Sequence, residues 1–248
     1  MKFLKILLLS PLALLRLFLT ILSSGLISSL GFVWLKLFGQ SRGLQRITMS
    51  SWGKSVLFSC GVKIDRNELP KFNNYILMPN HRSYLDIFIV SGYTPSAMVA
   101  KAELSSWPFL GMAMKVAGVI AVNRKDTRSL ISTMAKIKDS VSKGIPVALF
   151  PEGTTYKGPL TKKFKSGSFK IAADSGIPVI PMAIEYRDKN DAWVDDDKFV
   201  PHFFRQMGKP ITHVTVRYGE PLIDSDYKKL RSATKAYIEK MLLEIQKG

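Results

Sequence analysis

The chain has 248 residues, which favours one large α/β domain carrying an appendage. Lys and Arg total 36 against 19 Asp and Glu, and the formal charge of +17 implies an anionic partner such as nucleic acid, a phospholipid surface or an acidic carrier. Cys60 is the only cysteine, which excludes an intramolecular disulfide and a Cys-rich zinc site and fits a reducing, cytoplasm-facing domain.

The first 60 residues are cationic and strongly apolar. No acidic residue precedes Asp65, and an uncharged run from Leu17 to Leu35 is about long enough to cross a bilayer. A cleaved signal peptide is disfavoured, because Arg16 interrupts the apolar core and no clean small-x-small cleavage site follows it.

Ser23, Ser24 and Gly25 predict a turn between two helices within this segment. We therefore expect a two-helix hairpin that dips into one leaflet, with Arg16 and Lys36 reaching towards the headgroups. A single transmembrane helix is the alternative.

From about Val62 the pattern changes to short β-rich runs that alternate with helical ones. This alternation predicts an α/β sheet with helices on both faces, in a domain over 61–248 that follows an N-terminal segment over 1–60. Strands are predicted over 75–79, 97–100, 118–122, 146–150, 179–186 and 213–219, and helices over 126–143, 166–174 and 224–246, the last capped by Asp224 or Ser225.

The stretch "YILMPNHRSYLD" runs a predicted strand into Asn80, His81, Ser83 and Asp86. A carboxylate in the first turn of the following helix points back towards the cap, where it can hold one imidazole nitrogen as N–H and leave the other free as a base. The alternative is structural, because Ser83 and Asp86 also fit a helix-capping pattern.

Three further motifs follow predicted strands. Arg124 ends "GVIAVNR", where a guanidinium suits bidentate phosphate binding, although a solvated surface charge is the simpler interpretation. In "FPEGTTYKG", Gly153 allows backbone N–H groups to approach an anion, with Thr154 and Thr155 as donors. In "IPVIPMAI", Pro178 and Pro181 predict an edge strand or a bulge.

In this order, "NHRSYLD", "GVIAVNR", "FPEGTT" and "VIP" resemble the four sequence boxes of the glycerolipid acyltransferase family. The resemblance covers roughly residues 60–220 and is strongest to the bacterial 1-acyl-sn-glycerol-3-phosphate acyltransferases, which make phosphatidic acid. "VAKAELSSWPFLG" also resembles the linker between the family's first two boxes.

The resemblance implies an acyltransferase-type α/β sheet flanked by helices, with an N-terminal two-helix membrane motif. It implies that His81 deprotonates the hydroxyl of a lysophospholipid, which attacks an acyl thioester, while Asp86 orients the imidazole. Acyl-CoA or acyl-carrier protein is the expected donor, with no cofactor, no metal and no nucleic acid. The substrate-binding residues that it implies are Asn80, Ser83, Lys101, Arg124, Glu152, Gly153, Thr154 and Thr155.

The chain departs from the family pattern at Asn123 and Thr155, where many members have Asp and Arg. Lysines at 157, 162, 163 and 165 are candidate replacements for the arginine, or a basic face resting on anionic lipid. The acceptor is thus expected to be lysophosphatidic acid, with lyso-ornithine lipid and lysophosphatidylcholine as alternatives. A non-catalytic protein that binds anionic membrane or nucleic acid is the alternative of another class. The expected location is the cytoplasmic face of the cytoplasmic membrane.

Overall fold

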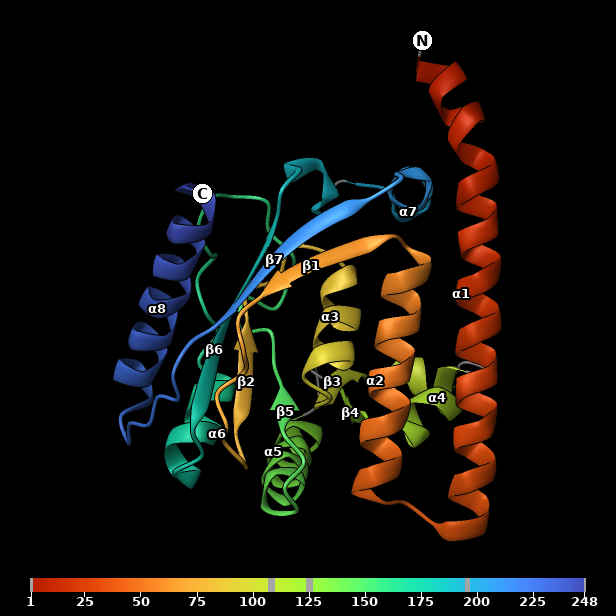
Figure 1. Ribbon diagram of the computed structural model, residues 1–248. Coiled ribbons are helices and arrows are strands. Elements are labelled where there is room, and N and C mark those ends of the chain that lie inside the picture. The colour runs from red at the N-terminus through yellow and green to blue at the C-terminus, as the bar shows by residue number, and fades with distance from the viewer. Residues whose placement is uncertain (1, 107–109, 124–126, 195–196, 248) are drawn as a thin grey trace.

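The computed structural model describes residues 2–106, 110–123, 127–194 and 197–247, and they form one seven-stranded sheet with helices on both faces (Figure 1). The strand order is β1-β7-β6-β2-β5-β3-β4. The strands are β1 (Val62–Arg66), β2 (Ile76–Pro79), β3 (Ala97–Lys101), β4 (Ile120–Val122), β5 (Val147–Ala148), β6 (Val179–Tyr186) and β7 (Thr212–Tyr218). The α/β prediction is confirmed, and the six predicted strands are all present.

The helices include the three predicted over 126–143, 166–174 and 224–246 and the one predicted to follow Ser83. The structure has α1 (Lys2–Phe38), α2 (Arg42–Ser59), α3 (Leu85–Tyr93), α4 (Leu110–Val116), α5 (Thr127–Ser142), α6 (Gly167–Ser175), α7 (Phe199–Gly208) and α8 (Tyr227–Lys247), with short 3-10 turns over Ala102–Ser106 and Lys189–Asp191. The sequence analysis did not identify β1, α4 or α7. The predicted cap of α8 is also wrong by a residue or more, because Asp226 accepts hydrogen bonds from the N–H groups of Lys228 and Lys229.

The core has two parts, one on each face of the sheet. Alternate residues of β2 and β6 point to opposite faces, as the period of a strand requires. Leu77 and Ile180 pack with α2 and α3, whereas Met78 and Val179 pack with α5, α6 and α8. Every residue of β6 is buried, because both of its faces are covered.

Pro181 lies inside β6, and β6 is an interior strand between β7 and β2, so the edge-strand interpretation is wrong. The bulge interpretation fits the register. Val179 pairs with Leu222, and Met182 pairs with Tyr218. Between these two pairs, the segment opposite β6 contains one residue more than β6 itself, which is the pattern of a bulge next to Pro181.

The predicted turn at 23–25 is wrong, because α1 runs without a break through these residues. Small side chains here serve helix packing instead: the Ser24 hydroxyl accepts a hydrogen bond from Trp52 Nε1 of α2 at 3.0 Å. The two-helix motif is present but its turn lies later, where Gly39 has φ +75° and Ser41 caps α2 by accepting from the N–H of Leu44.

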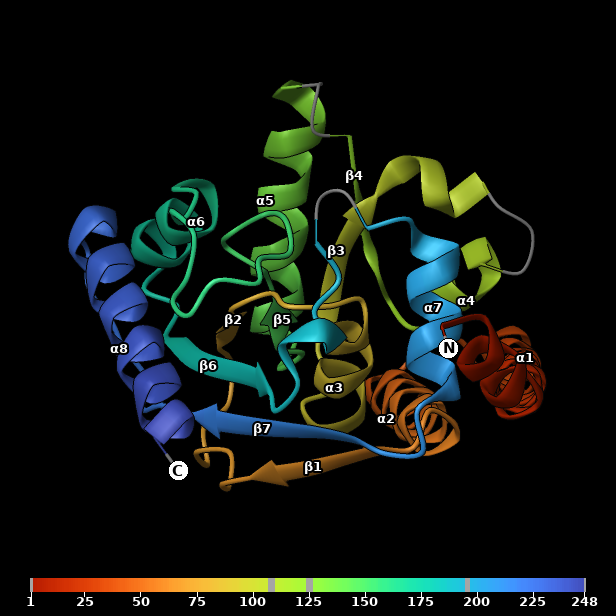
Figure 2. The same cartoon turned by 90° about the horizontal axis from the view of Figure 1, so that it is seen from above.

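Arg16 does not reach towards headgroups. Its side chain is buried, and its guanidinium donates to the carbonyl oxygens of Met207, Lys209 and Pro210 at the end of α7. Both views place α7 beside α1 (Figures 1 and 2), so Arg16 fastens α1 to α7 across about 190 residues of sequence. The segment Pro11–Phe38 of α1 is long and apolar enough to cross a membrane, and most of it is exposed.

Candidate active site

The site lies where the adjacent parallel strands β2, β5 and β6 end. β2 pairs with both β5 and β6, so the residues that follow these three strands meet at one edge of the sheet. His81 follows β2, Glu152 follows β5, and Tyr186 is the last residue of β6. The sheet topology therefore brings together segments separated by about 70 and 100 residues.

His81 and Asp86 form a hydrogen-bonded pair at this edge. The distance between His81 Nδ1 and Asp86 Oδ2 is 2.9 Å. The Asp86 carboxylate is fully buried, whereas the His81 side chain keeps 16% of its surface exposed. His81 Nε2 makes no hydrogen bond to the described part of the chain, and the imidazole stacks on Phe150 with 4.1 Å between ring centroids. One imidazole nitrogen is therefore held and the other is available to a ligand.

Asp86 is held in place by the start of α3. It lies in the first turn of the helix, and Oδ2 accepts hydrogen bonds from the backbone N–H groups of Arg82 at 2.6 Å and Ser83 at 2.9 Å. The structural and the catalytic interpretations of the motif therefore both fit Asp86, because its carboxylate caps the helix and also orients His81.

Tyr186 donates a further hydrogen bond to the Asp86 carboxylate. Its hydroxyl donates to Asp86 Oδ1 at 2.7 Å. Burial, together with the Asp86 charge, raises the pKa of Tyr186 well above its usual value, so the phenol stays a donor. A role for Tyr186 was not predicted from the sequence. The period of β6 is the signal that could have indicated it, because Ile180, Met182 and Ile184 share its face.

Glu152 supports the backbone around His81. Its two carboxylate oxygens accept from the N–H groups of His81 at 2.9 Å and Lys162 at 2.8 Å, and burial raises its pKa. In return, the N–H of Tyr156 donates to the carbonyl of His81 at 2.8 Å. The "FPEGTT" segment is thereby fixed to residues 80–86, the candidate catalytic loop, and both oxygens of Glu152 are engaged by protein.

Arg82 is a buried arginine that the sequence analysis did not single out. Its guanidinium donates to Glu185 Oε2 at 2.9 Å and to the carbonyl oxygens of Tyr156 at 2.9 Å and Leu160 at 3.1 Å. It therefore ties the loop after β5 to the end of β6. No local pattern distinguishes it from a solvated arginine, because its partners are about 75 and 100 residues away.

Besides Glu152, two more of the predicted substrate-binding residues have their side chains engaged in contacts within the protein. Asn80 is fully buried, and its side-chain amide both donates to the carbonyl and accepts from the N–H of Ile184. Ser83 is also fully buried, and its hydroxyl accepts from the N–H of Leu85 at 3.5 Å. These contacts favour a role in positioning the catalytic loop.

The remaining predicted residues lie around this edge or outside the described chain. Gly153 adopts φ +73°, Thr154 is exposed, and Thr155 is buried. Lys101 ends β3, although its side chain is not described, and Arg124 lies outside the described residues. Since β4 is three strands from β2, its end lies about 14 Å from the end of β2 at the usual strand spacing.

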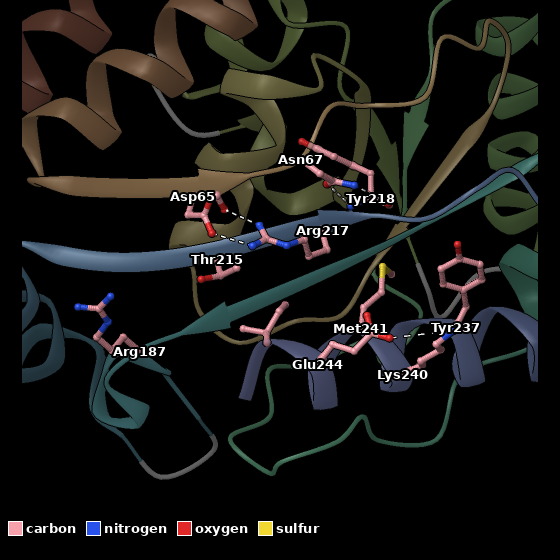
Figure 3. Close-up of a pocket in the computed structure, with 11 residues that line it drawn as sticks. Asp65, Asn67, Arg187, Thr215, Arg217, Tyr218, Tyr237, Lys240, Met241 and Glu244 are labelled. Carbon is pink, nitrogen blue, oxygen red and sulfur yellow. Dashed lines mark hydrogen bonds and ion pairs between the residues drawn. The ribbon is translucent and has the colours of Figure 1, made fainter. Parts of the chain in front are cut away.

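The pocket in Figure 3 is a separate feature. It has a volume of about 480 Å³ and lies between α8 and the outer strands β7 and β1. Its described lining includes none of the predicted site residues, and Arg217 within it donates to Asp65 Oδ2 at 2.7 Å. Among the described residues, no group of three His, Cys, Asp or Glu side chains is placed to hold a metal ion.

The fold and the site together define an α/β protein with a buried carboxylate that orients a partly exposed histidine, an arrangement able to deprotonate a hydroxyl. The sequence matches the Acyltransferase family over residues 62–185, which is half of the chain. The chain belongs to the acyltransferase family.

Individual relatives agree with this assignment. The chain is 33% identical to a 1-acyl-sn-glycerol-3-phosphate acyltransferase of Neisseria meningitidis serogroup B over 139 residues, covering 55% of this chain and 54% of that protein. It is 28% identical to a lyso-ornithine lipid O-acyltransferase of Rhizobium meliloti over 189 residues, covering 68% and 64%. The chain spans about half the length of the first of these relatives.

The fold has a solved counterpart. The 1-acyl-sn-glycerophosphate acyltransferase PlsC of Thermotoga maritima superposes with a TM-score of 0.73 over 99% of this chain and 98% of that one, at 21% sequence identity. This likeness shows that the whole arrangement of the chain, including α1 and α2, occurs in a solved protein.

Proposed function

We propose that the protein transfers an acyl chain from an acyl thioester to the sn-2 hydroxyl of lysophosphatidic acid, which gives phosphatidic acid. The observation that carries this proposal is the His81–Asp86 pair at 2.9 Å, in which His81 Nε2 makes no hydrogen bond to the residues that the structure describes. Family membership and the names of the relatives support the choice of reaction and acceptor.

In the proposed reaction, His81 Nε2 takes the proton from the acceptor hydroxyl as the oxygen attacks the thioester carbonyl. Asp86 stabilises the imidazolium that forms. The tetrahedral intermediate then collapses, the C–S bond breaks, and the imidazolium returns its proton to the leaving thiolate. The ester and a free thiol are the products, and no group from the protein enters a covalent intermediate.

The acceptor is proposed to bind through its phosphate near the ends of β4 and β5. Arg124 follows β4 in the sequence, and the exposed Thr154 follows β5. Lyso-ornithine lipid is the second candidate, because a relative of that name aligns over two thirds of this chain. Thr155, where many relatives in the family have arginine, also favours an acceptor with less negative charge.

The membrane surface is the proposed location, with the catalytic domain on the cytoplasmic side. One face of α1 packs on α2, α4 and α7, so a membrane-crossing α1 would draw these helices into the hydrocarbon. Exposed Arg46 and Lys54 on α2 make that costly. We therefore propose that α1 lies in one leaflet. Cysteines replacing Lys2 and Arg42 would both be labelled from the cytoplasmic side, whereas labelling from opposite sides would establish a span.

The acceptor is tested by thiol release with the full-length protein, using acyl-CoA and acyl-carrier protein in turn as donor. We would measure kcat/KM for lysophosphatidic acid, lysophosphatidylcholine and lyso-ornithine lipid in the wild type, Arg124→Ala and Thr155→Arg. We expect Arg124→Ala to weaken lysophosphatidic acid most, and Thr155→Arg to favour it further, since a guanidinium binds a phosphomonoester bidentately. Equal losses for all three acceptors would exclude lysophosphatidic acid as the cognate substrate.

A further inference from the structure

Helix α7 carries an apolar face that no described part of the protein covers. Phe199, Val200 and Phe204 are 48%, 60% and 36% exposed. On the opposite side of the same helix, His202 and Gln206 are buried in the domain. The exposed residues recur at helical spacing, so they form one face of α7 rather than scattered surface positions.

Helix α7 itself is in contact with α1, whose outer side is also apolar and exposed. Arg16 holds α1 against the end of α7, and its neighbours Leu14, Leu15 and Phe18 are each more than half exposed. Figure 2 shows α7 alongside α1 at the rim of the molecule. In Figure 1, the N-terminal part of α1 extends past α7 at the end towards which β2, β5 and β6 point. Two elements far apart in sequence thus present neighbouring apolar surfaces at the end of the molecule that carries the site.

The apolar face is also connected to the catalytic loop. The ring of Phe199 packs edge-on against Tyr84, with 5.4 Å between centroids, and against Trp193 at 5.8 Å. Tyr84 lies between His81 and Asp86 in the sequence, and the backbone N–H of Trp193 donates to the carbonyl of Arg82 at 2.9 Å. One layer of aromatic rings therefore separates the exposed face of α7 from the catalytic loop.

We propose that α7 is a second membrane-contact element, whose apolar face enters the lipid surface beside α1 and places the catalytic loop where a lipid acceptor leaves the bilayer. The substrate part of this statement rests on the proposed reaction, and the lipid contact rests on the proposed placement of α1 in one leaflet. Continuity with α1 favours lipid over a second protein copy. α7 carries the cation Arg205 and no carboxylate, but the sequence before it contains Asp195, Asp196 and Asp197. Because these charges oppose one another, the proposed contact depends on apolar burial rather than on attraction to anionic lipid.

The contact is tested directly with a fluorescent reporter on the full chain. Cys60 is buried, and burial raises its thiol pKa to about 12, so a new cysteine is labelled selectively. We would label Val200→Cys with an environment-sensitive dye and add phosphatidylcholine vesicles, with and without phosphatidylglycerol. Phe72→Cys is the control, because Phe72 is an exposed apolar residue that precedes β2, at the opposite end of the strand from His81.

We expect vesicles to reduce acrylamide quenching of the dye at position 200 about fivefold or more, at low and high salt, and to leave position 72 unchanged. Equal quenching at both positions on vesicle-bound protein would overturn the proposal. So would protection of position 200 that grows with protein concentration in the absence of lipid, because that result identifies a second copy of the chain as the occupant.

Activity provides a separate test. The double variant Val200→Ser/Phe204→Ser should lose about tenfold in kcat/KM for a long-chain acceptor held in vesicles, while a short-chain acceptor that is monomeric in water changes less than twofold. Phe72→Ser should change neither value. Equal losses for both acceptors would show that the α7 face acts through folding of the site and would refute lipid delivery. Protection of position 200 in a protein that acylates no lysolipid would refute the proposed function and leave the lipid contact standing.

Discussion

Replacing Tyr186 with Phe tests whether the buried hydroxyl tunes the His81–Asp86 pair or only stabilises the fold. The Tyr186 hydroxyl donates to Asp86 Oδ1 at 2.7 Å, and Asp86 has no exposed surface on which water could replace it. A hydrogen bond to a charged group contributes about 1.5–3 kcal/mol. At ~2–4 °C per kcal/mol for a chain of this size, the Tm should fall by several degrees.

The functional effect follows from the charge that the hydroxyl stabilises. Without it, the Asp86 carboxylate interacts more strongly with a positively charged imidazole, so the acidic limb of the pH profile of kcat/KM should move to higher pH. If about half of the lost free energy reappears in this attraction, the acidic limb of kcat/KM rises by roughly 0.5–1 pH unit, because one unit corresponds to about 1.4 kcal/mol. Activity on the plateau at higher pH should change much less.

The assay is the pH dependence of kcat/KM by thiol release, with Tyr218→Phe as the matched control. Tyr218 is also buried, and its hydroxyl hydrogen-bonds to Thr94 Oγ1 at 2.9 Å, away from Asp86. The control should lower the Tm and leave the pH limb in place. If Tyr186→Phe lowers the Tm with an unchanged pH limb, the hydroxyl is only structural and the reasoning fails.

Three further predictions follow from the same contacts. His81→Ala should keep its fold and lose acyl transfer by about 10²–10⁴-fold. Asp86→Asn should also be severely impaired. Wild-type turnover by purified His81→Ala would refute the general-base mechanism. Arg82→Met should cost at least about 1.5–3 kcal/mol in chemical denaturation, because it removes buried hydrogen bonds to Glu185 and to the carbonyl oxygens of Tyr156 and Leu160, although Glu185 stays paired with Lys189. Arg217→Met, which breaks the more exposed pair with Asp65, should cost less than about 1 kcal/mol, and equal costs would contradict the packing described. Arg16→Ala should release α1 from α7 and make limited proteolysis near residue 40 faster. Arg46→Ala, on the exposed side of α2, is the control and should not change the rate. Identical digestion of the two variants would contradict the anchoring role of Arg16.

The sequence predicted those parts of the structure that depend on neighbouring residues. Apolar runs such as "VIPMAIEY" identified the strands, since a strand buried on both faces needs a continuous apolar segment. The five-residue spacing of His81 and Asp86 sufficed to predict their contact, because a single helical turn returns the carboxylate to the preceding loop. The apolar N-terminal segment was evident from composition alone.

What the sequence did not predict depends on contacts between distant segments. Ser24 has the local character of a turn residue, yet its small side chain allows α2 to pack closely, and only the position of Trp52 reveals that use. Arg16 has the local character of a snorkelling cation, and its actual partners are backbone carbonyls at the end of α7. Backbone acceptors have no sequence signature, so neither role could have been recognised before the fold was known.

The catalytic loop over 80–86 is polar and yet largely buried, and its supports explain how this is possible. The end of β6 satisfies Asn80, Arg82 and Asp86, and the segment after β5 satisfies the backbone of His81 on both its N–H and its carbonyl. Most of the buried polar groups of this loop thereby have a partner, as burial requires, and Arg82 Nε is the exception. Because these contacts hold the loop in the folded protein, the His81–Asp86 geometry exists before any substrate binds. The reaction therefore does not carry the entropy cost of ordering the loop. The membrane contact that we propose would therefore act through the rim formed by α7 and the N-terminal helix rather than through this loop.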